Sequence, residues 1–298
     1  MDRTHHSDIR IGTLVPLKES VSYIPQIHGH GFESYQLNSW AELPFTNFDE
    51  HAAQVRDIIG DQAVISSLGM FGNPLTNDTT REAFATLLRN ARKYGAELVC
   101  GFTGALEDRP VDENMDRFRE VWGELTRIAE GEGVRIAFEN CDMGGTWMHP
   151  KWNIAHAPRA WRMMFDAVPS ESMGLEWEPC HQMVSLVDPL PQLNEWVGKI
   201  FHLHGKDAQI DWNKIKRDGI RCGEYIVIHR TPGFGDTNWT DVISILRKHG
   251  WQGSIDIEGW HDPVYRDDLE MTGQVHALNY LKACRGGAFV PNPHREEG

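Results

Sequence analysis

Short apolar segments that alternate with helical segments constrain the fold of this 298-residue chain more than any other feature. Strands that alternate with helices are typical of a parallel sheet, and eight repeats predict a (β/α)8 barrel of the TIM type. The predicted strands are residues 9–15, 32–37, 63–70, 97–104, 134–141, 173–180, 199–206 and 254–260. The clearest predicted helices are residues 80–94, 114–132, 158–167, 188–198 and 239–249.

Polar residues spaced two apart near the ends of the late strands favour a closed barrel over a doubly wound open sheet. Residues i and i+2 of a strand share one face, so each of these strands has a polar side and an apolar side. An open parallel sheet is covered by helices on both faces and reads as continuous apolar runs. The pairs are Glu176 and Glu178, His202 and His204, and Asp256 and Glu258.

The composition fits one barrel-sized domain, predicted over residues 1–284 and followed by a tail at 285–298. The chain is 40% hydrophobic, and its net charge of −14 argues against non-specific binding to nucleic acid. It contains no run of about 18 apolar residues, the length that a membrane-spanning helix needs. A small-molecule substrate is therefore expected, with neither a nucleic acid nor a membrane as partner.

The cysteines and the first residues predict a cytoplasmic protein. The five cysteines form no CxxC motif, so neither a disulfide framework nor a cysteine-based zinc site is expected. This pattern is typical of a reducing compartment. The opening sequence MDRTHHSDIR has no apolar stretch, so no secretory signal is expected there.

Four strands each end in an ionisable side chain on the polar face. These residues are Glu139, Glu178, His204 and Glu258. Three carboxylates and one imidazole suit one divalent ion, with manganese as the first expectation and magnesium, cobalt and zinc as alternatives. Salt bridges to Lys206, Arg135 or Arg230 would be the simpler explanation for any one of them. For four residues at the same end of four strands, the metal site is the stronger hypothesis.

Between residues 138 and 263 the chain resembles a known family. It is similar to the sugar-phosphate isomerase/epimerase family of xylose isomerase-like TIM barrels, which is related to endonuclease IV, and within it to the keto-sugar 3-epimerase branch. The first four strands match only by pattern. The matching motifs are FENCDMGGT (138–146), NIAHAPRAW (153–161), GLEWEPCH (174–181), IFHLHGKDAQID (200–211), RTPGFGDTNW (230–239) and SIDIEGWHDP (254–263).

The resemblance implies a role for each residue of the set. Glu139 takes the place of a metal ligand that also acts as a base, and His204 that of the imidazole ligand. Glu258 takes the place of the fourth ligand and second base. Glu178 stands where the family usually has an aspartate ligand, and the extra methylene predicts a difference in ligand geometry or metal preference.

The predicted activity is that of a divalent-metal-dependent epimerase or isomerase of a keto-sugar or keto-glycoside. Glu139 and Glu258 would remove and return a proton beside the carbonyl through a metal-stabilised enediolate. The alternative is a lyase that expels a group from a 3-keto glycoside by β-elimination. An endonuclease IV-like phosphodiesterase is disfavoured because strands 63–70 and 97–104 lack histidines. A non-catalytic sugar-binding barrel would leave the carboxylate pair unexplained.

Four further residues are predicted to contact the substrate: His181, Lys206, Arg230 and Trp147. Each has an ordinary structural alternative, namely a backbone-bonded histidine, a neutralising lysine, a surface salt bridge and loop packing. Two long connections, 141–157 and 207–238, leave the strand ends at which barrel enzymes build their sites. By analogy with the family, a homo-dimer or homo-tetramer is expected.

Overall fold

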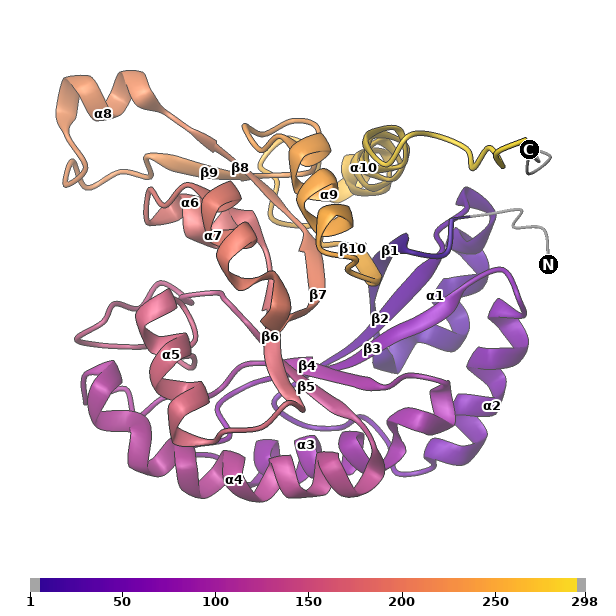
Figure 1. The fold of residues 1–298 in the computed structure, drawn as a ribbon, viewed down its shortest axis with the longest axis horizontal. Coiled ribbons are helices and arrows are strands. Elements are labelled where there is room, and N and C mark those ends of the chain that lie inside the picture. The colour runs from indigo at the N-terminus through magenta and orange to yellow at the C-terminus, as the bar shows by residue number, and fades with distance from the viewer. Residues whose placement is uncertain (1–5, 294–298) are drawn as a thin grey trace, which may run out of the picture.

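A closed ring of eight parallel strands forms the centre of the molecule, in a computed structural model that describes residues 6–293 (Figure 1). β1 pairs with both β2 and β10 and so closes the ring, which confirms the predicted barrel. The barrel strands are β1 (Ile9–Pro16), β2 (Ser34–Trp40), β3 (Val64–Phe71), β4 (Leu98–Gly101), β5 (Arg135–Glu139), β6 (Met173–Trp177), β7 (Ile200–Gly205) and β10 (Gly253–Ile257).

The described helices include all five that the sequence predicts, together with several that it does not. The predicted helix 80–94 divides into α3 and a 3-10 turn, η3. The α-helices are α1 (Ser20–Ile27), α2 (Phe48–Ile59), α3 (Asp78–Asn90), α4 (Met115–Glu132), α5 (Pro158–Ala167), α6 (Pro179–Val184), α7 (Pro189–Trp196), α8 (Trp212–Asp218), α9 (Trp239–Lys248) and α10 (Glu270–Cys284). The 3-10 turns are η1 (Leu17–Glu19), η2 (His28–His30), η3 (Ala91–Tyr94), η4 (Val111–Asn114), η5 (Val197–Lys199) and η6 (Asp267–Leu269).

The apolar core lies between the ring of strands and the surrounding helices. Phe138 on β5 packs edge-on against Trp122 on α4, with ring centroids 4.5 Å apart, and Phe84 on α3 contacts the same indole. The indole nitrogen of Trp122 donates to the backbone oxygen of Thr103, so this large ring is buried without losing its hydrogen bond. The outward faces of the strands thus carry the apolar residues, and the inward faces are left for polar chemistry.

An arm projects from the barrel between β7 and α9, at the upper left of Figure 1. It consists of an antiparallel pair, β8 (Asp207–Ile210) and β9 (Val227–Arg230), and of α8 between them. The sequence predicts a long connection at 207–238 but not its regular structure. The arm leaves the carboxyl end of β7, so its base lies beside the four predicted ligands.

The segment that follows α10 begins by packing against the barrel. Arg285, the first residue of the predicted tail, is buried, and its guanidinium contacts Glu33 at 2.6 and 2.9 Å. The predicted boundary at 284/285 is therefore the end of a helix and not the start of a free tail. Residues 1–5, from the segment predicted to lack a signal, and residues 294–298 of the predicted tail lie outside the described residues. No helix within residues 6–293 has the length and hydropathy needed to cross a membrane.

Candidate active site

The four predicted ligands converge at the carboxyl end of the barrel. One ligand atom from each lies within 4.8 Å of every other in a set formed by Glu139, Glu178, His204 and Glu258. Glu178 directly follows β6 with an extended backbone, so it continues the alternation of that strand before α6 begins. Because ligand atoms on opposite sides of a small divalent ion are about 4.2 Å apart, the four side chains surround a space for one such ion.

Unsatisfied polar atoms support a metal at this place. Both carboxylate oxygens of Glu178, His204 Nδ1 and Glu258 Oε2 are buried and lack a hydrogen bond to the described residues, and two of these carboxylate oxygens contact imidazoles, at 2.9 Å from Glu178 to His181 and 3.3 Å from Glu258 to His204. Buried polar atoms normally find a partner, and buried carboxylates require a compensating charge. A divalent cation among these atoms would satisfy them together, so the residues present fit the group.

His204 is oriented for metal binding by its second nitrogen. Nε2 lies 2.7 Å from Gln36 Oε1 and 3.1 Å from Glu176 Oε1, whereas Nδ1 faces Glu258 Oε2 at 3.3 Å and Glu139 Oε1 at 3.8 Å. A proton on Nε2 therefore has two acceptors, which leaves the lone pair of Nδ1 directed into the ligand set. Such supporting bonds fix the tautomer and angle of ligand histidines.

A buried polar layer lies beneath the ligands, as the sequence predicts. His202 bridges two carboxylates, with Nδ1 2.9 Å from Glu176 Oε1 and Nε2 2.8 Å from Asp256 Oδ2. The hydroxyls of Ser34 and Ser66 donate to Asp256, and the side-chain amide of Gln36 donates to Glu176. The layer fixes the base of the site through hydrogen bonds between opposite strands.

Gln36→Leu is expected to weaken divalent-metal binding about 10- to 100-fold, the usual effect of removing a partner that orients a ligand histidine. The leucine keeps the volume but removes the acceptor for His204 Nε2 and the donor to Glu176. The dissociation constant for Mn²⁺, obtained by competition with a chelator, measures the effect. Gln62→Leu, on an exposed turn, is the matched control. An unchanged constant in the Gln36 variant would show that Gln36 does not position His204.

The two predicted bases lie in different electrostatic surroundings. Burial, together with the neighbouring Glu178, raises the pKa of Glu139 well above its ordinary value. Burial also acts to raise the pKa of Glu258, but Lys206 and the nearby imidazoles of His204 and His261 outweigh it and hold that pKa well below the ordinary range. Glu139 is thus the stronger base of the pair.

Within residues 6–293, Lys206 is the only lysine or arginine that lines the pocket above these residues. Its ammonium lies 2.8 Å from Glu258 Oε1 and 3.3 Å from His181 Nε2. Burial acts to lower the pKa of Lys206, but Glu178 and Glu258 raise it well above its usual value. Burial likewise acts to raise the pKa of Glu178, but His181 and Lys206 lower it to about 2. Both partners therefore stay charged at neutral pH.

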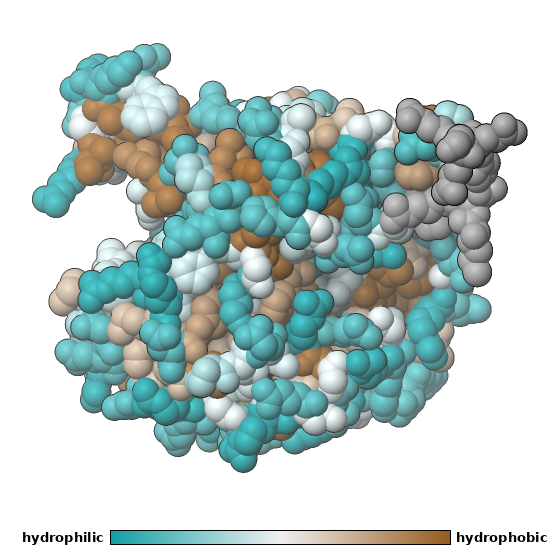
Figure 2. Space-filling view, in the orientation of Figure 1, coloured by the Kyte–Doolittle hydropathy of each residue, from teal (hydrophilic) through white to brown (hydrophobic). Residues whose placement is uncertain are grey.

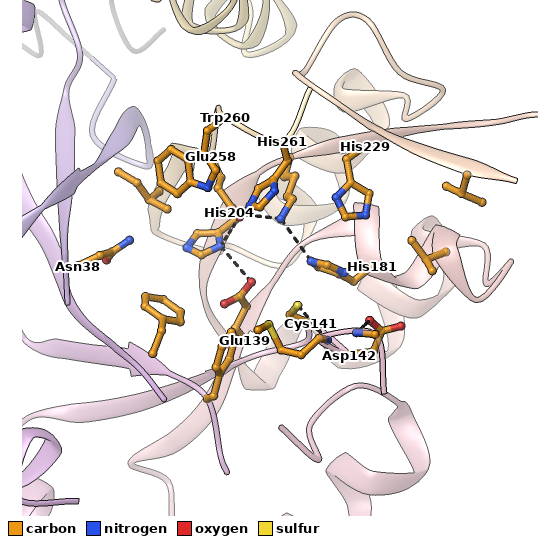
Figure 3. Close-up of a pocket in the computed structure, with 18 of the residues that line it drawn as sticks. Asn38, Glu139, Cys141, Asp142, His181, His204, His229, Glu258, Trp260 and His261 are labelled. Atoms are coloured by element: carbon orange, nitrogen blue, oxygen red, sulfur yellow. Dashed lines mark hydrogen bonds and ion pairs between the residues drawn. The ribbon is translucent and has the colours of Figure 1, made fainter. Parts of the chain in front are cut away.

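The pocket has a volume of about 730 Å³, within the roughly 300–1,000 Å³ range of small-molecule sites. Glu139, His204 and Glu258 lie at its base, with Asn38 on one side and His181 and His229 on the other (Figure 3). Glu178 is completely buried behind this surface. A bound molecule therefore meets the ligand set at the end of a cleft whose walls come from β2, the loop after β5 and the arm.

Two of the four predicted substrate-binding residues do not line the pocket. The indole of Trp147 donates to Asp112 and stacks under the guanidinium of Arg159, 4.3 Å from its ring centroid. Arg230 is held by Asp262 at 3.0 Å and by Gln209. Trp147 thus makes the loop-packing contact, and Arg230 the salt bridge, that the sequence offered as alternatives to substrate binding. His181 and Lys206 do line the pocket, so they alone are kept as candidates.

Several residues of the site, one behind His204 and two on the pocket wall, were not predicted. Gln36 belongs to the predicted strand 32–37, and the same two-residue alternation that found the glutamates would have identified it. Asn38, which has a buried oxygen without a hydrogen bond to the described residues, lies one residue beyond that predicted strand. His229 lies on β9, where the alternating sequence YIVIHR gave a strand signal. Burial, followed by the nearby charge of Lys206, lowers the pKa of His229 to about 3, so this imidazole is neutral.

Three cysteine-containing groups also place ligand atoms within 4.8 Å of one another. They are Cys180 with His181 and His229, Cys100 with Glu176 and His202, and Cys141 with Glu139 and His181. A cysteine binds metal as the thiolate. Burial raises the pKa of all three thiols well above the ordinary value, so they remain protonated and are weaker candidates than the four-residue set.

Residues 24–284 match the sequence pattern of the xylose isomerase-like TIM barrel family. The chain belongs to this family. The match covers the whole barrel apart from β1, including the early strands that the motifs did not reach. Inosose dehydratases of Bacillus velezensis and Bacillus licheniformis are 23% and 24% identical to this chain over 248 residues, which is 82% of the chain and 72% of each relative.

The names of solved structures with the same fold differ in the activity that they describe. A xylose isomerase domain protein from Planctomyces limnophilus has a TM-score of 0.68 at 16% identity, covering 94% of this chain and 98% of that one. The apo 3-keto-D-glucoside 4-epimerase YcjR from E. coli has a TM-score of 0.67 at 12% identity, covering 93% and 100%. The IOLI protein with a binding zinc atom has a TM-score of 0.63 at 16% identity, covering 92% and 96%. At these identities the likeness establishes the fold alone.

Proposed function

We propose that this protein is a divalent-metal-dependent lyase that removes a β-substituent from a keto-sugar, keto-cyclitol or keto-glycoside. The observation that carries the proposal is the unequal surroundings of the two carboxylates at the base of the pocket. Glu258 Oε1 lies 2.8 Å from Lys206 Nζ and 3.0 Å from His261 Nε2, whereas among the described residues the cationic or imidazole partner of Glu139 is His204, at 3.8 Å, and its other close neighbours are the carboxylates of Glu178 and Glu258. Elimination needs one base, which Glu139 supplies, whereas inversion of a carbon needs a second carboxylate to return the proton on the opposite face. Because Glu258 is neutralised by Lys206, elimination fits this arrangement better.

Glu139 would remove the proton from the carbon next to the substrate carbonyl. Burial and the neighbouring Glu178 raise the pKa of Glu139, and none of the lysines and arginines in the described part of the chain pairs with its carboxylate. Glu178, His204, Glu258 and one oxygen of Glu139 would hold the divalent ion, which supplies a Lewis acid to the carbonyl and its neighbouring hydroxyl. The set favours manganese among the divalent ions, and the zinc in the IOLI structure supports a divalent ion of some kind.

The leaving oxygen would be met on the opposite side of the ligand set. Lys206, His181 and His261 all line the pocket there and supply hydrogen bonds and a proton to that oxygen. Elimination requires that one proton be removed from carbon and that one be given to the leaving oxygen. Glu139 would perform the first step and the donors on the opposite side would perform the second. The names of the inosose dehydratase relatives describe a reaction of this kind.

Epimerisation is the second candidate because it begins with the same proton abstraction. Glu258 Oε2 is buried without a hydrogen bond to the described residues, so one oxygen of the second carboxylate could return a proton. The name of the structurally similar 3-keto-D-glucoside 4-epimerase supports this reading. The two reactions differ only in whether the carbanion is reprotonated or expels its β-substituent.

Incubation in deuterated water separates the candidates. The Mn²⁺-loaded protein is given an inosose, a ketohexose and a methyl 3-keto-glucoside, and the products are followed by NMR and by absorbance of the conjugated enone. Loss of water or methanol with enone formation is the expected result. Deuterium at an inverted carbon without loss of a group would make the protein an epimerase. No exchange on any of the three would refute both readings.

Lys206→Met is expected to slow elimination about 100-fold, the usual value of a positioned proton donor. The same change removes the cation from Glu258 and makes that carboxylate a better base, so the ratio of epimerised to eliminated product should rise. Product ratios by NMR on the methyl 3-keto-glucoside give the readout. Lys206→Arg retains the charge and serves as the matched control. A fall in both products by the same factor would contradict the assigned role.

A further inference from the structure

Two apolar walls rise from the catalytic residues to the mouth of the pocket. On one side, the Phe71 ring lies 6.5 Å from the His204 imidazole and packs against Phe102, and both rings contact Trp40. Phe71 and Phe102 are buried, whereas Trp40 is 54% exposed at the rim. This wall therefore begins at a metal ligand and ends as an open aromatic face.

The second wall comes from the arm. Val227 is buried, Ile226 is half-buried and Tyr225 is 88% exposed, and all three line the pocket. Val227 lies two residues before His229, whose ring is 5.1 Å from that of His181. Figure 2 shows apolar residues gathered along the arm, above a hollow at the left of the molecule. Like the first wall, this one runs from catalytic residues to an exposed aromatic side chain.

The outer part of the pocket lacks a free lysine or arginine among the described residues, although the carboxylates of Asp142 and Glu224 also line it. Lys206 is the single lysine or arginine among the described lining residues, and Glu258 already neutralises it. A phosphate on the substrate would find no free cation there. The whole pocket measures about 730 Å³, so a lone sugar ring would fill only its polar base and leave both apolar walls in water.

We propose that the outer pocket binds an aromatic aglycone, so that the substrate is a keto-glycoside with an aryl or arylalkyl group. This inference rests on the proposed function. Planar aromatic rings stack on, or pack edge-on against, the rings of tryptophan, tyrosine and phenylalanine. A saturated group that buries the same area lacks this additional interaction. Trp40 and Tyr225, each exposed at the rim of a wall, are the residues expected to set this specificity.

The reaction is balanced without a further reactant. Glu139 takes the hydrogen at C2 of a 3-keto sugar as a proton, and the electrons of that bond form the C1–C2 double bond. The bond from C1 to the aglycone oxygen breaks with its electron pair, and that oxygen takes a proton from the Lys206 side. The products are an enone and the free aryl alcohol, and nothing is oxidised or reduced.

A pair of substrates with similar leaving oxygens tests the subsite. Benzyl and methyl 3-keto-glucosides both release a simple alkoxide, so a difference between them reports the ring and not the leaving-group acidity. The expected kcat/KM ratio of benzyl to methyl is about 10 or more, in the range that a filled apolar pocket gives. Trp40→Ala and Tyr225→Ala should each bring the ratio toward one. Trp212→Ala, on the arm but outside the pocket lining, should keep it.

The outcomes distinguish the two proposals. If neither glycoside reacts and an inosose and a ketohexose show no exchange either, the proposed function fails, and binding of unreactive benzyl and methyl glucosides, followed by tryptophan fluorescence, still tests the subsite. If both react with a ratio near one, the function stands and the aromatic subsite is refuted. A cyclohexylmethyl 3-keto-glucoside that matches the benzyl compound would refute the aromatic preference. Because Trp40 and Tyr225 are exposed, their alanine variants are expected to fold.

Discussion

Glu139→Gln will lower the rate of proton abstraction about 10³-fold, within the 10²–10⁴-fold range of general-base catalysis. The amide has nearly the same shape as the carboxylate but cannot take a proton from carbon. Burial holds the pKa of Glu139 well above its ordinary value, whereas that of Glu258 is held low, so Glu258 cannot replace it as the base. Solvent deuterium incorporation into an inosose or a 3-keto glycoside measures this step whether the outcome is elimination or epimerisation.

Two controls separate the loss of a base from other effects. Metal content is measured on the same sample, because Glu139 also belongs to the ligand set. Glu139→Asp keeps a carboxylate and should recover part of the exchange, while Glu113→Gln, on the exposed surface, should leave it unchanged. Exchange at the native rate in metal-loaded Glu139→Gln would move the base assignment to Glu258.

Glu178→Ala is expected to abolish binding of the divalent ion. The side chain is completely buried, one of its oxygens belongs to the ligand set, and neither oxygen has a hydrogen bond to the described residues. Its removal also leaves His181 and Lys206 without a carboxylate that they contact at 2.9 and 4.0 Å. In the native protein, a metal concentration 100 times the dissociation constant adds about 2.7 kcal/mol to the free energy of unfolding. The free energy of unfolding of the Glu178→Ala variant should not rise when the metal is added.

Thermal unfolding with and without Mn²⁺, together with metal analysis of the purified protein, measures the difference. Glu171→Ala removes a carboxylate that is exposed and outside the site, so its response to the metal should equal that of the native chain. Glu178→Asp, which introduces the aspartate that the sequence resemblance implies at this position, should regain binding with an altered preference among Mn²⁺, Co²⁺ and Zn²⁺. A native metal response in Glu178→Ala would remove Glu178 from the ligand set.

The secondary structure was largely predictable because strand and helix patterns depend on nearby residues. All eight barrel strands lie within a few residues of their predicted positions, and the alternation of polar and apolar residues places His204 and Glu258 on the inward face. The less regular elements were missed. Helix α10 lacks a clear apolar face, and the arm that contains α8 was predicted only as a connection.

The sequence by itself determined the barrel and the residues of the ligand set, since two-residue periodicity and strand order place side chains at the same end. Tertiary structure alone decided which of the remaining candidates reach the pocket. Trp147 packs against Arg159, and Arg230 forms a salt bridge with Asp262. The positions of these partners depend on how the loops pack and cannot be predicted from a local sequence pattern. The unequal surroundings of Glu139 and Glu258 arise in the same way. Lys206 follows β7 and Glu258 follows the neighbouring strand β10, and the pairing of these two strands brings the ammonium within 2.8 Å of that carboxylate.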